Sequence, residues 1–339
     1  MENNMKDIVS RGWPSAANNL TIRPGDVYCQ RPDVQQPDEL FKKAKTWLEV
    51  IQDAPRDELQ DVVTKDIQES MIRAIFGSNQ IERAGLNQTI TNHLCRRILN
   101  GEDVGAISEG DPDSQSALLD LYHLDPTLRK LPGKDVLRSR NEVVQHCKAF
   151  EFLLKAFVLE HEHLTESLIQ ETHRILAEGV PITDCEGPEV LPEEYGGVYR
   201  TVVVGAGTTN FTVPKFVPAK MKKMCEDLKD ELEATEKNKA IDPFSTAAKY
   251  SLEFVQIHPF MDGNGRMCRM ILNAILCRYA GVIVPIGEQG AEREEYMQIK
   301  RDSSAKMEGH GEYATFVLVR ATRRIREMKK KLSGKKTKA

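Results

Sequence analysis

The sequence has no long apolar run and no obvious sorting signal. All its apolar stretches fall short of the roughly 20 residues that a helix needs to span a bilayer. The first 30 residues show neither a basic start with an apolar core nor a cleavage site. These absences predict a protein without a membrane segment that resides in the cytoplasm, or alternatively in the nucleus.

The sequence also has little net charge. Its 339 residues include 47 Lys and Arg and 51 Asp and Glu, which give a formal charge of -4 at pH 7. A balance this close to neutral gives no reason to expect specific binding of nucleic acid or of an anionic membrane. With 40% hydrophobic residues, the chain can bury one large core or two smaller ones.

Cysteines are few and are not arranged in pairs. The seven cysteines are odd in number and show no CxxC spacing, which argues against a disulfide framework and against a structural zinc site. The Asp-Pro-Asp cluster at residues 111–113 lacks the spacing of a calcium-binding loop. We therefore expect free thiols.

What the sequence does contain is one dense group of chemically active residues. Residues 258–269 read HPFMDGNGRMCR and lie between an amphipathic run, 244–257, and an apolar run, 270–279. The periodicity of both runs predicts a loop between two helices. Because Pro259 disfavours helical geometry in the residue before it, His258 is predicted at the end of the first helix.

The start of the second helix is predicted to bind an anion. Gly263 and Gly265 flank Asn264 and leave backbone amides free there. Free amides and the positive end of the helix dipole together attract negative charge. Arg266 and Arg269 are three residues apart, so they share the helix face one turn further on. We expect a polyphosphate as the ligand.

Asp262 comes directly before these glycines. From that position its carboxylate can hold a magnesium ion that bridges phosphate oxygens, or it can cap the helix. The residues alone leave both possibilities open.

The order His-Pro-Phe-x-Asp-Gly-Asn-Gly-Arg-x-x-Arg resembles the signature of Fic-domain proteins, which transfer AMP from ATP to hydroxyl side chains of target proteins. Every fixed position of that signature is filled here. The resemblance implies a mainly α fold, namely a Fic-type helical bundle with a small β-hairpin flap next to the active site. It also implies ATP as the donor, Mg2+ or alternatively Mn2+ as the metal, and a protein substrate with a hydroxyl side chain.

The resemblance assigns roles within the signature. His258 would take the proton from the target hydroxyl, Phe260 would anchor the loop in the core, and Asp262 would bind the metal. Arg269 would hold the γ-phosphate. The catalytic residues would be His258, Asp262, Asn264 and Arg266, and the phosphates would be held by Gly263, the Asn264 side chain, Gly265, Arg266 and Arg269.

A second motif lies upstream. Ser78 and Glu82 resemble the inhibitory motif Ser/Thr-x-x-x-Glu of some Fic proteins, in which the glutamate pairs with the second arginine of the signature, here Arg269. A carboxylate on that guanidinium competes with phosphate for the same donors. The sequence departs from the family at Arg83, where relatives have Gly or Asn. The alternative is a surface glutamate after a helix.

Two further features follow from the resemblance. Residues 198–205 and 210–214 read as two short strands of the flap, and a flap at 198–213 could hold an extended target segment by main-chain hydrogen bonds or simply cover the core. Tyr296, within 293–300, is a candidate for contact with adenine, with plain packing as the alternative.

The chain is expected to divide into an irregular lead-in at 1–36, an N-terminal helical region with the inhibitory helix at 37–140, a Fic catalytic domain at 141–328 and a solvated basic tail at 329–339. Helices are expected from Pro37, over 56–76 and over 141–159, and residues 100–134 read as a loop-rich connection with one helix. Thr165 is expected to cap a helix on which His173 is packed or exposed, Asp242 and Pro243 open the helix before the signature, and Gly281 ends the one after it.

The predicted function is thus protein AMPylation, including self-modification, with inhibition by Glu82 and possible homodimerisation. Three alternatives stay open. Glu82 could position a water that removes AMP from a modified side chain. The transferred group could be phosphate or phosphocholine, although the intact signature argues against phosphate. The chain could also be a regulatory binding module with little turnover.

Overall fold

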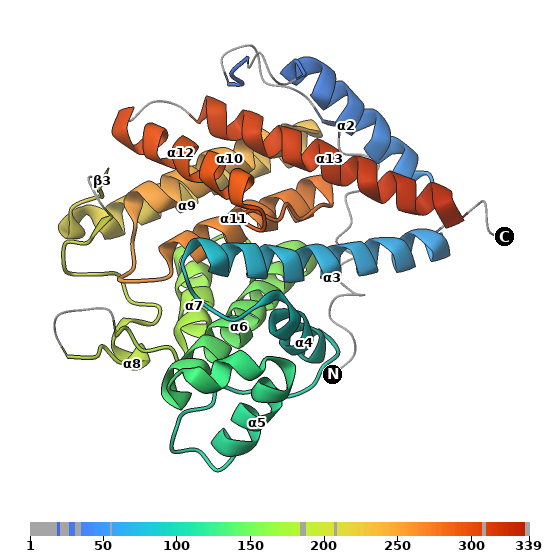
Figure 1. Ribbon diagram of the computed structural model, residues 1–339. Coiled ribbons are helices and arrows are strands. Elements are labelled where there is room, and N and C mark those ends of the chain that lie inside the picture. The colour runs from blue at the N-terminus through green and yellow to red at the C-terminus, as the bar shows by residue number, and fades with distance from the viewer. Residues whose placement is uncertain are drawn as a thin grey trace.

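The computed structural model describes residues 19–20, 27–30, 35–54, 56–183, 188–206, 209–306 and 310–335. In these ranges the chain is mainly α-helical, as predicted (Figure 1). The longer helices are α2 (Pro37–Gln52), α3 (Arg56–Ile81), α4 (Gln88–Leu99), α5 (Ser114–Leu124), α6 (Gly133–Leu154), α7 (Glu166–Ala177), α9 (Val217–Asn238), α10 (Pro243–Ile257), α11 (Asn264–Ala280), α12 (Gly290–Lys306) and α13 (Gly311–Lys335). The short elements are η1 (Pro126–Lys130), η2 (Lys155–Leu159), α8 (Pro192–Tyr195), η3 (Pro214–Phe216), β1 (Asn19–Leu20), β2 (Gly205–Ala206), β3 (Thr209–Asn210) and β4 (Ala240–Ile241).

Helix α11 is the centre of the fold. All of its residues except Gly265 are buried, and it packs against α10, α3, α6 and η2. In Figure 1, α3 crosses the molecule between a lower group of helices, α4 to α7, and an upper group, α9 to α13. None of the helices in the described ranges is both long and apolar enough to cross a bilayer.

The predicted helix ends that flank the signature are confirmed. Asp242 caps α10, because its carboxylate accepts the amide hydrogens of Phe244 at 3.2 Å and Ser245 at 3.0 Å. Thr165 caps α7 through the amide of Leu168 at 3.2 Å. Gly281 ends α11 in the left-handed conformation, with φ 64°, which glycine adopts without steric cost.

Several predicted boundaries are wrong. Helix α4 was missed, and α3 continues to Ile81, so the inhibitory motif lies in its last turn rather than after it. Helix α6 begins at Gly133, so the expected domain boundary at residues 140 and 141 falls within a continuous helix. The single helix expected in 100–134 is present as α5, followed by the turn η1.

The two ends of the chain are more structured than predicted. In the lead-in, β1 pairs in parallel with β4. At the other end α13 runs on to Lys335, so residues 329–335 are helical, although most of them are exposed. Lys331 donates to Asp66 at 2.8 Å and to Glu69 at 3.0 Å, and these ion pairs tie the basic end of α13 to α3. The remainder of both predicted segments lies outside the described residues.

The flap is shorter than the predicted strands. Its hairpin consists of β2 and β3, with Gly205 opposite Asn210 and Ala206 opposite Thr209. The predicted strands over 198–205 and 210–214 are therefore wrong in extent. The reason lies in Arg200, whose backbone amide donates to the carbonyl of Pro259 at 2.8 Å and so pairs with the catalytic loop instead of a neighbouring strand.

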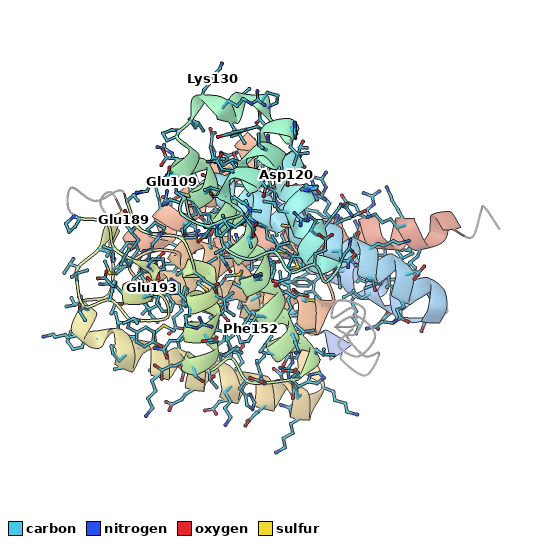
Figure 2. All side chains as sticks on the ribbon, turned by 90° about the horizontal axis from the view of Figure 1, so that it is seen from below. Glu109, Asp120, Lys130, Phe152, Glu189 and Glu193 are labelled. Atoms are coloured by element: carbon cyan, nitrogen blue, oxygen red, sulfur yellow. The ribbon has the colours of Figure 1, made fainter. Side chains whose placement is uncertain are left out.

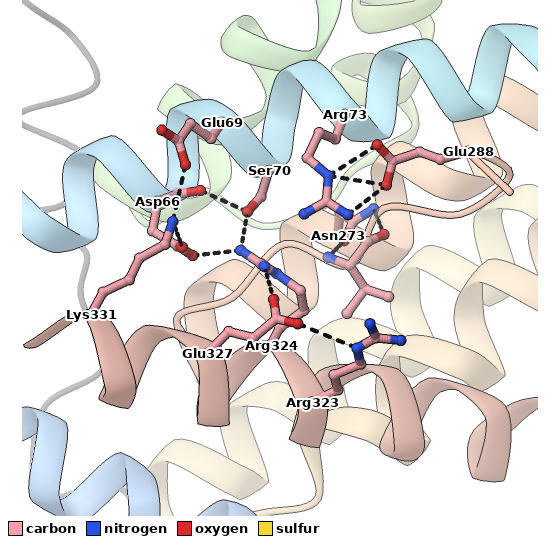
Figure 3. A network of polar contacts seen from close by, with 11 residues as sticks. Asp66, Glu69, Ser70, Arg73, Asn273, Glu288, Arg323, Arg324, Glu327 and Lys331 are labelled. Atoms are coloured by element: carbon pink, nitrogen blue, oxygen red, sulfur yellow. Dashed lines mark hydrogen bonds and ion pairs between the residues drawn. The ribbon is translucent and has the colours of Figure 1, made fainter. Parts of the chain in front are cut away.

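A network of ion pairs holds α3 along its length (Figure 3). Arg324 of α13 donates to Asp66 at 2.7 Å and to Ser70 at 2.6 Å, and both the Arg324 and the Asp66 side chains are buried. One turn further along α3, Arg73 forms three hydrogen bonds to Glu288 in the segment before α12. The helix that ends in the inhibitory motif is thus fastened to α13 and to the 281–289 connection.

Candidate active site

The signature forms a loop between the end of α10 and the start of α11, as predicted. His258 follows α10 with φ 53°, and its amide donates to the carbonyl of Phe254 at 2.9 Å. A positive φ is uncommon for a residue with a side chain, and such conformations gather at functional sites. The turn takes the chain out of α10 and sets the imidazole at the edge of the loop.

Asn264 holds this loop together. Its side-chain oxygen accepts the amide hydrogen of Phe260 at 2.9 Å, and its side-chain nitrogen donates to the carbonyl of Phe260 at 2.8 Å. Phe260 is fully buried, which confirms it as the anchor. Each polar end of the Asn264 amide makes one bond inside the loop, so the side chain clamps the loop, and its predicted contact with phosphate stays a prediction.

His173 was not predicted as part of the site. Its ring stacks on Phe260 with centroids 3.7 Å apart and planes 4° apart. The amide of Gly197 donates to its Nδ1 at 2.9 Å, so Nε2 carries the proton and donates to the carbonyl of Asp262, also at 2.9 Å. His173 is thus packed, as expected, but it also positions the loop. Burial lowers its pKa to about 4, which keeps the ring neutral.

His258 is suited to act as a base. Its Nδ1 lies 3.2 Å from the carbonyl of Val255; the carbonyl can only accept, so Nδ1 carries the proton and Nε2 keeps a free lone pair. The ring stacks on Phe211 of the flap, with centroids 3.7 Å apart. Burial, with a smaller contribution from the charge of Arg200, lowers the pKa of His258 to about 4 against the opposing effect of the Val255 bond.

Arg200 joins the flap to the signature loop, a role that was not predicted. Its buried guanidinium donates to the carbonyl of His258 at 2.6 Å and to that of Thr212 at 2.5 Å. Burial lowers the pKa of Arg200, and its partners are carbonyl oxygens rather than a carboxylate. The side chain therefore sets the flap against His258.

The start of α11 has the features of an anion site. Gly263 adopts φ 75°, and a side chain at Gly265 would collide with the Glu82 carboxylate, 2.1 Å from the added carbon. Arg266 is buried and donates to Asp262 at 2.8 Å, while its Nε and Nη1 have no hydrogen-bond partner among the described residues. Buried donors without partners are costly, and phosphate oxygens would satisfy them.

Asp262 is the only predicted metal ligand. Burial opposes ionisation of its carboxyl, but Arg266 and the amide of Gly263 outweigh that effect and lower its pKa. In the described part of the chain no three metal-binding side chains lie together. One ionised carboxylate still fits Mg2+, because this ion keeps several waters and often takes its other ligands from substrate phosphates.

The inhibitory motif meets Arg269, so the predicted contact is present. Arg269 donates to Glu82 at 2.5 Å, to the Ser78 hydroxyl at 2.8 Å and to the Ser78 carbonyl at 3.3 Å. Burial opposes the charge on Arg269, but Glu82 more than offsets it and raises the pKa. The Glu82 carboxylate thus lies beside Gly265, where an anion at the start of α11 would bind.

Arg83 takes over the helix-ending role of the family's glycine or asparagine. It adopts φ 54°, and the amide of Ala84 donates to the carbonyl of Asn79 at 2.9 Å. This is the hydrogen bond of a Schellman-type helix end. The departure at Arg83 therefore preserves the turn that presents Glu82.

Tyr296 lies in the core. It packs against Tyr313 and Phe316, with ring centroids 6.0 and 6.2 Å away, and only 2% of its surface is exposed. The Arg269 guanidinium lies 5.9 Å from its ring centre, so the ring supports this arginine. Tyr296 therefore packs in the core, which was the alternative, and its contact with adenine stays a prediction.

Because burial lowers the pKa of His173, we expect the protein to lose stability in acid. The unfolded chain binds a proton on His173 near pH 6.5, whereas the folded chain binds it only near pH 4, so the free energy of unfolding falls as pH falls through this window. For His173 the fall amounts to about 3 kcal/mol. The free energy of unfolding, measured with denaturant between pH 7 and 4, should depend less on pH in His173→Phe than in wild type. In His123→Ala, at an exposed position, it should depend on pH as in wild type. Equal slopes for His173→Phe and wild type would contradict the assignment.

Comparison with known proteins identifies relatives of this arrangement. A sequence profile of the Fic/DOC family matches residues 163–276. A Fido domain-containing protein of Dictyostelium discoideum is 35% identical over 106 residues, which cover 31% of this chain and 69% of that protein. The protein adenylyltransferase fic-1 of Caenorhabditis elegans is 32% identical over 160 residues, 46% of this chain but only 28% of the relative. The chain therefore matches less than a third of the length of that curated enzyme.

Solved structures share the fold. A Fic domain containing signaling protein from Bacteroides thetaiotaomicron superposes with a TM-score of 0.59 at 20% identity, over 88% of this chain and 98% of the other. Fic-1 from Caenorhabditis elegans superposes with a TM-score of 0.62 at 20% identity, over 89% of this chain and 74% of the other. The predicted helical fold of this type is thus confirmed.

Proposed function

This chain belongs to the Fic/DOC family, and from that membership we propose that it transfers AMP from ATP to a hydroxyl side chain of a protein, in a form inhibited by Glu82. The observation that carries the proposal is the position of His258. His258, a neutral base with a free Nε2, lies at one end of the six-residue loop. At the other end is an anion site, where Arg266 has donors without a partner among the described residues. That combination suits an attack on a bound phosphate by a hydroxyl group.

The chemical step begins with the proton. His258 Nε2 takes the hydroxyl proton of a Ser, Thr or Tyr side chain as its oxygen attacks the α-phosphorus. The new oxygen–phosphorus bond forms while the bond to the β-phosphate bridging oxygen breaks, so pyrophosphate leaves with that electron pair. The Nδ1 bond to Val255 keeps the tautomer that this step needs.

The anionic donor is held by the start of α11. Its free amides, the unpartnered Nε and Nη1 of Arg266 and the guanidinium of Arg269 would bind phosphate oxygens. Asp262 would hold Mg2+ or Mn2+, and the ion would supply charge neutralisation on the phosphates. These groups are fixed before the reaction, which is what transition-state stabilisation requires.

The protein substrate is proposed to bind along the flap. Arg200 fastens this hairpin to the loop carbonyls next to His258, and Val203 on its outer side is 83% exposed. Main-chain pairing with β2 or β3 would place a target hydroxyl without demanding a particular sequence. Self-modification and control by homodimerisation belong to the same proposal.

A second candidate, removal of AMP from a modified side chain, rests on Glu82. Among the described residues, only one oxygen of its carboxylate is bonded to Arg269, and the side chain is 35% exposed. The other oxygen is available to orient a water molecule. Incubating an AMP-modified protein with wild type and Glu82→Gln, and following release of AMP, would separate the two directions.

Transfer is tested by incubating the full chain with labelled ATP and Mg2+ and measuring intact mass. Glu82→Gly should gain one AMP per modified site, and the double variant Glu82→Gly/His258→Ala should gain none. No adduct in either variant, together with none on a panel of added proteins, would refute AMP transfer. That result would favour AMP removal, another transferred group or a regulatory binding module.

A further inference from the structure

A cavity outside the catalytic loop has no role in AMP transfer. It has a volume of about 370 Å³ and is lined by α4, the segment 103–107, α5 and Arg140 of α6. None of its lining residues belongs to the signature loop or to α3. Helix α5 lies at the bottom of Figure 1, at the opposite end of the molecule from α12 and α13, and Figure 2 labels Asp120 on it.

The most buried residues of the cavity lining are three apolar side chains and one cation, whereas the residues nearer the surface are mixed polar and apolar and include His93 and a second cation, Arg97. Leu94, Val104 and Leu121 are each 2% exposed, and Arg140 is 5% exposed. A buried lining of this kind suits a small ligand with an apolar body and one polar end.

Arg140 lacks a partner for its charge. Its Nη1 donates to the carbonyl of Gly105 at 2.9 Å and to the Asn141 side chain at 3.2 Å. Across the described ranges no carboxylate forms an ion pair with it, and its Nε and Nη2 make no hydrogen bond. Burial lowers the pKa of Arg140 to about 10, and the charge of Arg97 lowers it further. Because Arg140 lines the cavity, an anion that enters can reach the two free donors and compensate the charge.

The mouth of the cavity restricts the charge of that anion. Asp103, Asp113 and Asp120 line it and are exposed. Their carboxylates repel a doubly charged phosphate more strongly than a singly charged carboxylate. The planar fork of a guanidinium also matches the two oxygens of a carboxylate.

We propose that this cavity binds a monocarboxylate with a short apolar body. The carboxylate pairs with the free donors of Arg140, and the body lies on Leu94, Val104 and Leu121. The proposal is independent of AMP transfer, because it uses no residue of the catalytic loop.

Hexanoate is the probe, with hexan-1-ol as the matched compound that lacks the charge. Titration of the full chain by calorimetry, with amide NMR shifts to locate the site, should show hexanoate binding next to Arg140 at least about tenfold more tightly than the alcohol, because charge-assisted hydrogen bonds are the stronger ones. Arg140→Gln should abolish the difference. Arg129→Gln, on the exposed turn η1, should leave binding unchanged.

A second variant is expected to bind more tightly, a result that misfolding could not produce. Asp120→Asn removes one repulsive charge at the mouth and should strengthen hexanoate binding by roughly two- to threefold at low salt. Equal affinity for hexanoate and the alcohol, no binding of either, tighter binding of inorganic phosphate, or no gain in Asp120→Asn would each overturn the proposal.

Discussion

Replacing Glu82 with glycine is expected to raise the rate of AMP transfer by roughly ten- to a hundredfold at ATP concentrations below saturation. The carboxylate bonds Arg269 at 2.5 Å and lies against Gly265, so it holds the donors that phosphate needs. A hydrogen bond to a charged group contributes about 1.5–3 kcal/mol. Removing the competing bond therefore changes the equilibrium for ATP binding by roughly ten- to a hundredfold.

The helix end should tolerate this change. Glu82 follows the last residue of α3, and the turn is made by the left-handed Arg83 and the bond from Ala84 to Asn79. The measurement is the initial rate of AMP incorporation together with the dissociation constant of ATP. Glu82→Gln keeps the side chain's size without its charge and should give an intermediate rate. Equal rates for wild type, Glu82→Gln and Glu82→Gly would mean that Glu82 does not restrain the enzyme.

Replacing His258 with alanine, in the Glu82→Gly background, is expected to lower the transfer rate by about a hundred- to ten-thousandfold, the usual contribution of a general base. ATP binding should change little, because the only protonated ring nitrogen of His258 is bonded to Val255 and gives nothing to phosphate. Single-turnover rates and equilibrium ATP binding, measured side by side, separate the two effects.

The same assay has an internal control and a pH test. His123→Ala, on the exposed face of α5, should react like its parent. Because the pKa of His258 is near 4, the base is already neutral at pH 6, so the rate should not fall through protonation of this residue between pH 8 and 6. A His258→Ala enzyme with the parent rate would remove His258 from the mechanism.

The parts of the site that are continuous in the sequence could be predicted, and the parts that come together from a distance could not. The loop and its glycines followed from local spacing. The exception is the pairing of Glu82 with Arg269, 187 positions apart, which only the family resemblance implied. Arg200 and His173 bond residues 58 and 89 positions away, and no local pattern reports such contacts. The bonds of the Asn264 side chain to Phe260 were not predicted, because a motif does not say which polar side chain turns inward.

In the fold, too, local features could be predicted and features that depend on distant contacts could not. Helix ends with a capping side chain or a glycine were placed well, whereas the end of α13 was missed. Its lysines read as a solvated run, but Lys331 faces two carboxylates on α3. The strands of the flap were overextended because the hydrogen bond of Arg200 to Pro259 competes with strand pairing, and that competition depends on the tertiary structure.

The attachment of α3 determines how inhibition can be relieved. Moving the helix away from α11 would break the buried pair of Asp66 with Arg324 and the bonds of Arg73 to Glu288, and breaking a buried pair alone costs about 3–5 kcal/mol. Turning the Glu82 side chain about its own bonds breaks only the contact with Arg269, and staggered rotamers differ by far less. If Glu82 inhibits as proposed, an activating signal would not need to dislodge the helix. A nucleotide or target that displaces a single carboxylate would suffice, and the scaffold would stay unchanged.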